Sequence, residues 1–127
     1  MTQHNINLSE ELAEHVIWNV RLRCFLEGKE CISRDEAVSD KHCKLGLWIK
    51  ALSKMPYGHS RTIHDLQKTH RQLHATVRRI IRLKNEHETG LARKELTRLE
   101  ILNKNIITLL NEFDEATVQK QHNALGI

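Results

Sequence analysis

Three histidines and one cysteine are the residues of this sequence that could do chemistry together. His70 and His74 lie four residues apart in the segment HRQLH, so on a helix both rings would project from one face, one turn apart. Cys43 lies in the segment HCKLGLWIKAL, and His15 lies in the segment HVIW. Imidazole nitrogen and thiolate sulfur together are the ligand types that suit zinc best. These residue types therefore indicate a candidate metal site.

The hydrophobic pattern places the same three histidines on the apolar faces of helices. The apolar stripe of a helix expected over about residues 60–87 includes His70 and His74, and the stripe of a helix expected over about residues 8–27 includes His15. An H-x-x-x-H pair alone is typical of surface or hydrogen-bonded histidines. Burying three imidazoles without partners would cost free energy, and one shared metal ion removes that cost. The stripe positions, with Cys43 to complete the set, favour a zinc site.

Two further helices are expected, and all four must position these ligands. One spans about residues 40–53 with Asp40 as its N-cap, and the other spans about residues 91–121, with Gly90 separating it from the preceding helix. Gly28 is expected to end the first helix, and Asn7 to cap its start. The apolar positions of the last helix recur at intervals of 3, 4, 3 and 4, which is a bundle pattern: Leu99, Leu102, Ile106, Leu109 and Phe113.

Length and composition favour a single helical domain. The chain has 127 residues, only 5 glycines and 1 proline, and 4% aromatic residues, a poverty of turn and strand formers. Amphipathic helices with short connections fold most simply as an antiparallel bundle. The sequence therefore predicts one all-α domain over residues 1–127, an antiparallel four-helix bundle with a zinc site in its core.

Charge and hydropathy argue against two classes of partner. The net charge is only +4, and isoleucines at core spacing interrupt the basic run RRIIRLK, so a solvated helix face is expected there rather than a nucleic-acid interface. No apolar run approaches 18 residues and no signal peptide is recognisable, so no membrane partner is expected. Three cysteines, an odd number, fit a reducing cytoplasm. There, a cysteine such as Cys43 is expected to be a metal ligand or a redox thiol rather than half of a structural disulfide.

Three short motifs, in order, resemble the signature of the chemoreceptor zinc-binding (CZB) domain family. That pattern is H-x-x-W, then C-x-L-G-x-W, then H-x-x-x-H. The matching residues, with ligand intervals of 28, 27 and 4, are His15 and Trp18, then Cys43, Leu45, Gly46 and Trp48, then His70 and His74. The three motifs in this order identify the family more specifically than any one of the motifs does alone.

The resemblance implies a bacterial sensory domain with a helical-bundle fold. It implies one zinc ion per chain, bound by three histidines and one cysteine, here His15, Cys43, His70 and His74. Members of the family usually accompany cytosolic chemoreceptors or diguanylate cyclases, where they are thought to sense zinc or an oxidant such as hypochlorous acid through the zinc-bound cysteine. They often form homodimers. This chain carries no recognisable output module of that kind.

Other functions remain open at this point. The zinc could be purely structural, in a bundle that scaffolds a partner protein. A hemerythrin-like di-iron bundle would need inward carboxylates, and Asp65 and Glu86 do not fall on the inward face. Four protein ligands leave a tetrahedral zinc no open position, so we expect no enzyme activity.

The first expected helix carries a second apolar strip, which could form an interface between two copies of the chain. Val16, Ile17 and Val20 lie roughly opposite the stripe that contains His15. A homodimer interface would explain this strip, and so would deeper burial of the helix inside one bundle.

Overall fold

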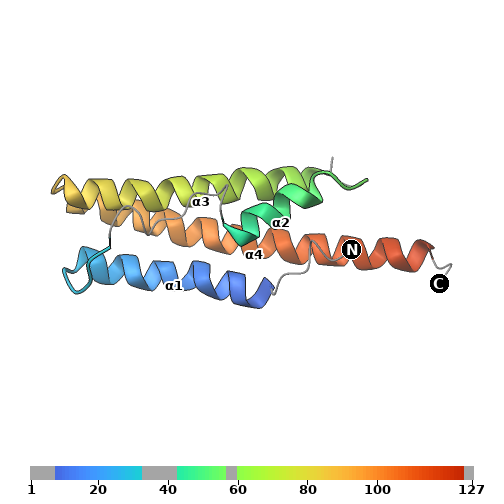
Figure 1. Cartoon of the computed structure of the whole chain (residues 1–127), viewed down its shortest axis with the longest axis horizontal. Helices are drawn as coiled ribbons and strands as arrows, with labels where there is room; N and C mark the ends of the chain where they lie inside the picture. The colour runs from blue at the N-terminus through green and yellow to red at the C-terminus, as the bar shows by residue number, and fades with distance from the viewer. Residues whose placement is uncertain (1–7, 33–42, 57–59, 125–127) are drawn as a thin grey trace.

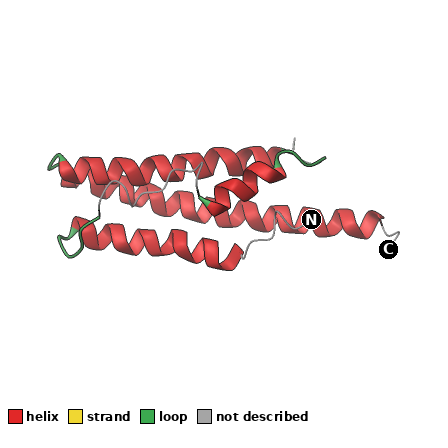
Figure 2. Cartoon of the chain, in the orientation of Figure 1, coloured by secondary structure: helices red, strands yellow, loops and turns green. Residues whose placement is uncertain are grey.

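The computed structural model describes residues 8–32, 43–56 and 60–124, with side chains described from residue 10 to residue 112 within these ranges. The chain forms α1 (Leu8–Leu26), α2 (Lys44–Leu52), α3 (Arg61–Asn85) and α4 (Thr89–Ala124) (Figure 1). Every regular element in these ranges is a helix (Figure 2). None of the described helices is both long and apolar enough to span a membrane.

The helices form an antiparallel bundle, as predicted. Successive helices run in opposite directions, so α1 and α3 point one way while α2 and α4 point the other (Figure 1). Helices α3 and α4 make a long hairpin, α1 packs along α4, and the nine-residue α2 lies against one end of α3. The short α2 therefore contacts both α1 and α3.

The predicted apolar stripes build this core. Every residue of the apolar stripe predicted for α3 is buried: Ile63, Leu66, His70, Leu73, His74, Val77 and Ile81. In α4, Leu99, Leu102 and Ile106 are buried and Leu109 is partly buried, while the side chain of Phe113 lies outside the described residues. In α1 the predicted stripe contributes Leu22 and Leu26, which are buried, and Leu12 and Trp18, which are partly buried.

Local capping explains where α1 ends and where α3 begins. Gly28 has a φ of 77°, and its N–H donates to the Phe25 carbonyl while the Lys29 N–H donates to the Cys24 carbonyl. This left-handed glycine ends α1, as predicted. The Ser60 hydroxyl accepts a hydrogen bond of 3.3 Å from the Ile63 N–H at the start of α3.

Two predicted helix boundaries were wrong. Helix α2 begins at Lys44, not near residue 40, because Cys43 has an extended backbone and serves as its N-cap. Helix α4 begins at Thr89, so Gly90 lies inside its first turn. The left-handed residue that turns the chain between α3 and α4 is His87, with a φ of 64°. The predicted caps Asn7 and Asp40 lie outside the described residues.

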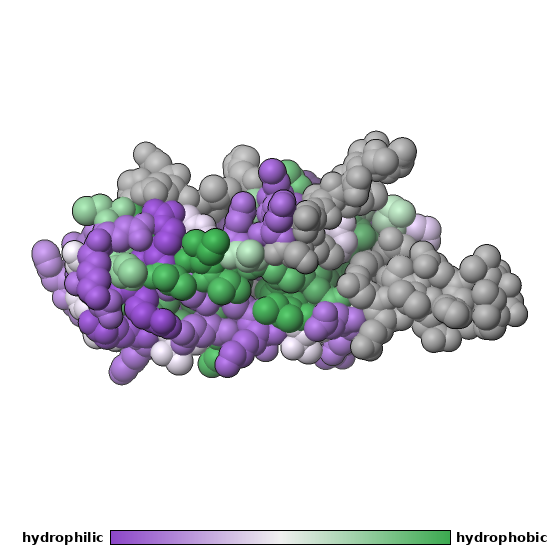
Figure 3. All heavy atoms as spheres, turned by 90° about the horizontal axis from the view of Figure 1, so that it is seen from below, coloured by the Kyte–Doolittle hydropathy of each residue, from purple (hydrophilic) through white to green (hydrophobic). Residues whose placement is uncertain are grey.

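The second apolar strip of α1 is exposed in the isolated chain. Val16, Ile17 and Val20 are 45%, 54% and 54% exposed. Viewed from the side of the bundle that α1 covers, apolar residues gather along the middle of the face (Figure 3). Burial of this strip inside its own bundle, one of the two explanations of the sequence pattern, is therefore wrong.

Candidate metal centre

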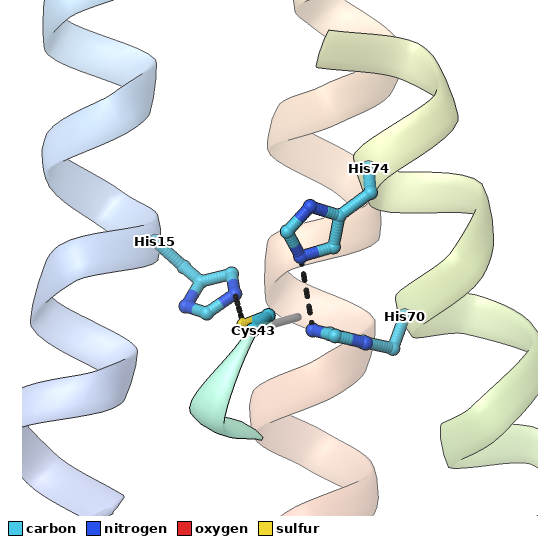
Figure 4. Close-up of side chains that lie close together, drawn as sticks. All are labelled: His15, Cys43, His70 and His74. Carbon is cyan, nitrogen blue, oxygen red and sulfur yellow. Dashed lines mark hydrogen bonds between the residues drawn. The ribbon is translucent and has the colours of Figure 1, made fainter. Parts of the chain in front are cut away.

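Two helices and the N-cap of a third bring the four predicted ligands together. His15 comes from α1, Cys43 from the N-cap of α2, and His70 and His74 from successive turns of α3 (Figure 4). One nitrogen of each histidine and the Cys43 sulfur all lie within 4.8 Å of one another. The histidines are 2–9% exposed, and Cys43 is partly buried. Residues far apart in the sequence thus converge at a single point of the core.

Two distances between ligand atoms match those expected around a tetrahedral zinc ion. Typical Zn–N and Zn–S bond lengths place two nitrogens of a tetrahedron about 3.3 Å apart and a nitrogen and a sulfur about 3.6 Å apart. The Nε2 atoms of His70 and His74 are 3.2 Å apart, and the Cys43 Sγ is 3.5 Å from the His15 Nε2 (Figure 4). The chemistry of this donor set, three nitrogens and one sulfur, also suits zinc.

A backbone hydrogen bond orients His15 toward the cluster. The His15 Nδ1–H donates to the Glu11 carbonyl oxygen, one turn earlier in α1, at 2.6 Å. With Nδ1 as the donor, Nε2 is the nitrogen that faces Cys43. Metal-binding histidines are commonly held by such a contact on the second ring nitrogen, which fixes the ring and its tautomer.

The surroundings of Cys43 favour its thiolate form. Burial by itself raises the pKa of a thiol, but hydrogen bonds from His15, His70, His74 and the backbone of Gly46 outweigh it and lower the pKa of Cys43 to about 3. Because only a thiolate binds zinc or attacks an oxidant, the sulfur is prepared for either reaction before a metal arrives.

The histidines respond to the same cluster in different ways. Burial alone lowers the pKa of His15, but its hydrogen bonds to the Cys43 sulfur and the Glu11 backbone raise that pKa overall. Burial also lowers the pKa of His70, and the hydrogen bond to Cys43 does not reverse this. A metal-free cluster therefore favours a His15 imidazolium paired with the Cys43 thiolate, and a metal ion would displace that proton.

Carboxylates do not join the cluster, which argues against the di-iron hypothesis. Among the described residues, the group that could hold a metal contains only histidines and cysteine. Asp65 is 3.8 Å from Arg61 in an ion pair, and Glu86 is exposed at the C-cap of α3. A di-iron bundle would need such side chains to point inward.

None of the other histidines and cysteines whose side chains the structure describes belongs to the cluster. His64 and His87 are exposed, Cys24 is partly buried and Cys31 is exposed. His4, His42 and His59 lie outside the described residues, and only the backbone of His122, in α4, is described. Both tryptophans of the motifs pack in the core or against it. Trp48 is buried in the core, and Trp18 is partly buried beside the cluster, with the Arg21 guanidinium 4.7 Å from its ring centroid.

Sequence reasoning missed Glu11 and the cavity that it lines. Glu11 is 6% exposed, and the cavity, of about 220 Å³, also meets His15, Trp18, Cys43 and His74. Burial, followed by repulsion from Glu14, raises the pKa of Glu11. The signal was available, because Glu11 precedes His15 by four residues and so shares its inward face.

Comparison with known proteins agrees with this geometry. The sequence pattern that defines the chemoreceptor zinc-binding domain matches residues 15–81, which is more than half of the chain and includes all four residues of the cluster. No curated protein and no solved structure matches the chain.

Proposed function

The chain belongs to the chemoreceptor zinc-binding domain family, and on that basis we propose that it is a zinc-dependent regulatory domain. The observation that carries the proposal is the convergence of three imidazoles and one thiolate within 4.8 Å in a bundle core. The proposed ligands of one zinc ion per chain are His15, Cys43, His70 and His74. A bound zinc ion would link these side chains by accepting lone pairs from the three imidazole nitrogens and the Cys43 thiolate.

The short helix α2 is the proposed moving part. Isolated helices of nine residues are unstable in water, so α2 depends on its tertiary contacts. Those contacts are its buried apolar face, which includes Leu45 and Ile49, and the Cys43 sulfur at its N-terminus. Loss of the Cys43 tether, through low zinc or oxidation of the sulfur, would leave α2 held by its apolar face alone. This loosened attachment of α2 would then be the structural change that a signalling partner detects.

We extend the proposal to the context of the domain. Residues 1–127 act as one cytoplasmic domain that forms a homodimer and passes the change in α2 to a signalling partner. The family points to a chemoreceptor or a diguanylate cyclase as that partner, in chemotaxis or in cyclic-di-GMP signalling. The role is regulatory rather than enzymatic, because four protein ligands leave zinc no position for a substrate.

Metal content tests the site. We expect the purified protein to contain one zinc per chain by native mass spectrometry. The double variant His70→Ala/His74→Ala should lose it, whereas His64→Ala, an exposed histidine on the same helix, should keep it. Stoichiometric zinc in the double variant would overturn the assignment.

Hydrogen exchange separates a sensor from a structural scaffold. If α2 is the moving part, removing zinc should speed amide exchange in α2 well before it does so in the α3–α4 hairpin. A scaffold would instead lose protection in all four helices together, because metal binding would stabilise the fold as a whole. Uniform loss of protection would contradict the sensor proposal and leave the zinc assignment intact.

A further inference from the structure

Two asparagines carry buried amide atoms that have no hydrogen-bond partner among the described residues. These atoms are the Nδ2 of Asn103 in α4 and the Oδ1 of Asn19 in α1. The Asn103 side chain is only 7% exposed, and Asn19 is partly buried. Buried polar atoms of proteins are nearly always paired, so two such atoms need an explanation. One of them is a donor and the other is an acceptor, so each can satisfy the other.

The ion pair between Arg23 and Glu100 places the two asparagines at the same level of the bundle. The Arg23 Nη2 is 2.8 Å from the Glu100 Oε2, which aligns α1 with α4 at this point. The two helices pack antiparallel, so a step back along α1 corresponds to a step forward along α4 (Figure 1). Asn19 precedes Arg23 by four residues, and Asn103 follows Glu100 by three. Each asparagine is therefore about one helical turn from the ion pair, in the same direction.

Both asparagines lie on the faces that their helices bury. Asn19 precedes Leu22 by three residues, and Leu22 is fully buried. Asn103 follows Leu99 by four residues and precedes Ile106 by three, and both of these residues are buried. The two amides therefore lie in the interior of the bundle, where α1 packs along α4.

The other contacts between these helices specify the position of α1 along α4 only weakly. The Arg23 and Glu100 side chains are 54% and 40% exposed, so their ion pair contributes little and salt screens it. Burial of apolar side chains is non-directional. Paired amides differ, because a shift that separates them leaves two buried polar groups unsatisfied. Buried asparagines specify the register of coiled coils in this way, at a cost in stability.

The position of α1 along α4 decides whether His15 reaches the candidate metal centre. Among the described residues, His15 is the one member of the cluster that α1 supplies, and Asn19 follows it by one turn on the same face. A shift of α1 by one residue would move His15 about 1.5 Å along the helix axis. Metal–ligand bonds tolerate deviations of only about 0.2 Å. The metal centre therefore needs α1 in a single register.

We propose that Asn19 and Asn103 pair across the α1–α4 interface and fix α1 in the register that presents His15 to the metal centre. The Asn103 Nδ2–H donates and the Asn19 Oδ1 accepts, directly or through one shared water molecule. Both are positioning residues, since neither belongs to the cluster. The pair itself does not depend on the proposed zinc function, whereas the positioning of His15 rests on it.

NMR of the full chain tests the pair without reference to zinc. We expect a nuclear Overhauser effect between the side-chain NH₂ protons of Asn103 and the Cβ protons of Asn19. Asn19→Leu removes the acceptor and should speed exchange of the Asn103 NH₂ protons with water about tenfold. Asn105→Leu, the same substitution at an exposed position of α4, should leave that exchange unchanged. Absence of the Overhauser effect, or exchange that Asn19→Leu does not alter, would overturn the pair.

A double-mutant cycle tests the positioning of His15. Asn19→Leu and Asn103→Leu each leave one buried amide unpaired, so each should lower stability to urea and weaken zinc binding. The double variant Asn19→Leu/Asn103→Leu replaces the pair with apolar side chains and should be more stable than either single variant. Its zinc affinity should nevertheless stay about fivefold or more below that of wild type, because α1 would occupy the correct register only part of the time. Competition with a chelating dye measures this affinity, and Asn105→Leu should not change it.

The two measurements separate this inference from the zinc function. Wild-type zinc affinity in the double variant would mean that the asparagines are only structural, which would overturn their positioning role and leave the zinc function intact. A wild-type protein that binds no zinc would refute the zinc function and the positioning of His15 together. The Overhauser effect would still support the pair in that case.

Discussion

Cys43 is both the N-cap of α2 and the sulfur of the candidate metal centre. Its backbone is extended, so the residue stands just outside the helix, and its side chain contacts His15 of α1. Hydrogen bonds from three imidazoles hold its pKa at about 3 although the sulfur is partly buried. A change at this one sulfur atom therefore acts on the attachment of a whole helix.

We predict that Cys43 is the first cysteine to react with hypochlorous acid. Its sulfur would give two electrons to chlorine and release hydroxide, and water would then replace chloride to form the sulfenic acid. A sulfenic acid is a weaker zinc ligand than a thiolate, so zinc should be released in proportion. A chelating dye measures the zinc, and peptide mass spectrometry maps the oxidised cysteine.

The other two cysteines are the internal controls for this prediction. Cys31 is exposed, and Cys24 is partly buried in α1 away from the cluster. If access alone governed the reaction, Cys31 would oxidise first and zinc would stay bound. That result would mean that Cys43 is a closed structural ligand and that the protein is not an oxidant switch.

Two glycines illustrate how the helices are joined. Gly28 ends α1 in a left-handed conformation that other residues adopt only with strain, whereas Gly90 lies in the first turn of α4 with open space around the position of an added Cβ. Gly90 was expected to separate the last two helices, yet His87 provides the left-handed turn there. The two glycines therefore have opposite roles in stability.

Alanine substitutions should move stability in opposite directions. Gly28→Ala should lower the free energy of unfolding by about 1 kcal/mol, because alanine is strained at a positive φ. Gly90→Ala should raise it by about 0.5 kcal/mol, because alanine restricts the unfolded chain and meets no obstacle in the helix. Urea unfolding of the zinc-loaded proteins measures both. A stabilising Gly28→Ala would show that the left-handed cap is not required.

The whole molecule carries an apolar surface on α1 that its own bundle does not cover. Val16, Ile17 and Val20 are each about half exposed. Apolar residues gather along the middle of the face that α1 covers (Figure 3). Scattered apolar residues are normal on a protein surface, but three on one helix face suit an interface. A second copy of the chain remains our predicted partner for this surface.

Sedimentation tests the dimer. At micromolar concentration the protein should sediment with about twice the chain mass, and Val20→Glu should convert it to a monomer because the dimer would bury an unpaired charge. Ile101→Glu is the matched control, since Ile101 is 55% exposed on α4. A monomeric wild-type protein, or a dimer that only Ile101→Glu disrupts, would contradict an interface through α1.

Sequence alone determined the existence of the four helices and the three histidine candidates, because both depend on local periodicity. The pattern of apolar residues placed His15, His70 and His74 on inward faces, and these residues are buried as predicted. The interval between His70 and His74 needed only the geometry of one helix. The order of the three motifs then identified the family correctly.

Only the tertiary structure decided how these residues meet. The distance from His15 to Cys43 depends on how α1 and α2 pack side by side, and no spacing along 28 residues determines it. Cys43 has an extended backbone and His87 has a left-handed one. The residue type at neither position specifies its backbone conformation. The cavity at Glu11 is lined by residues from all four helices, so it exists only once the helices are packed together.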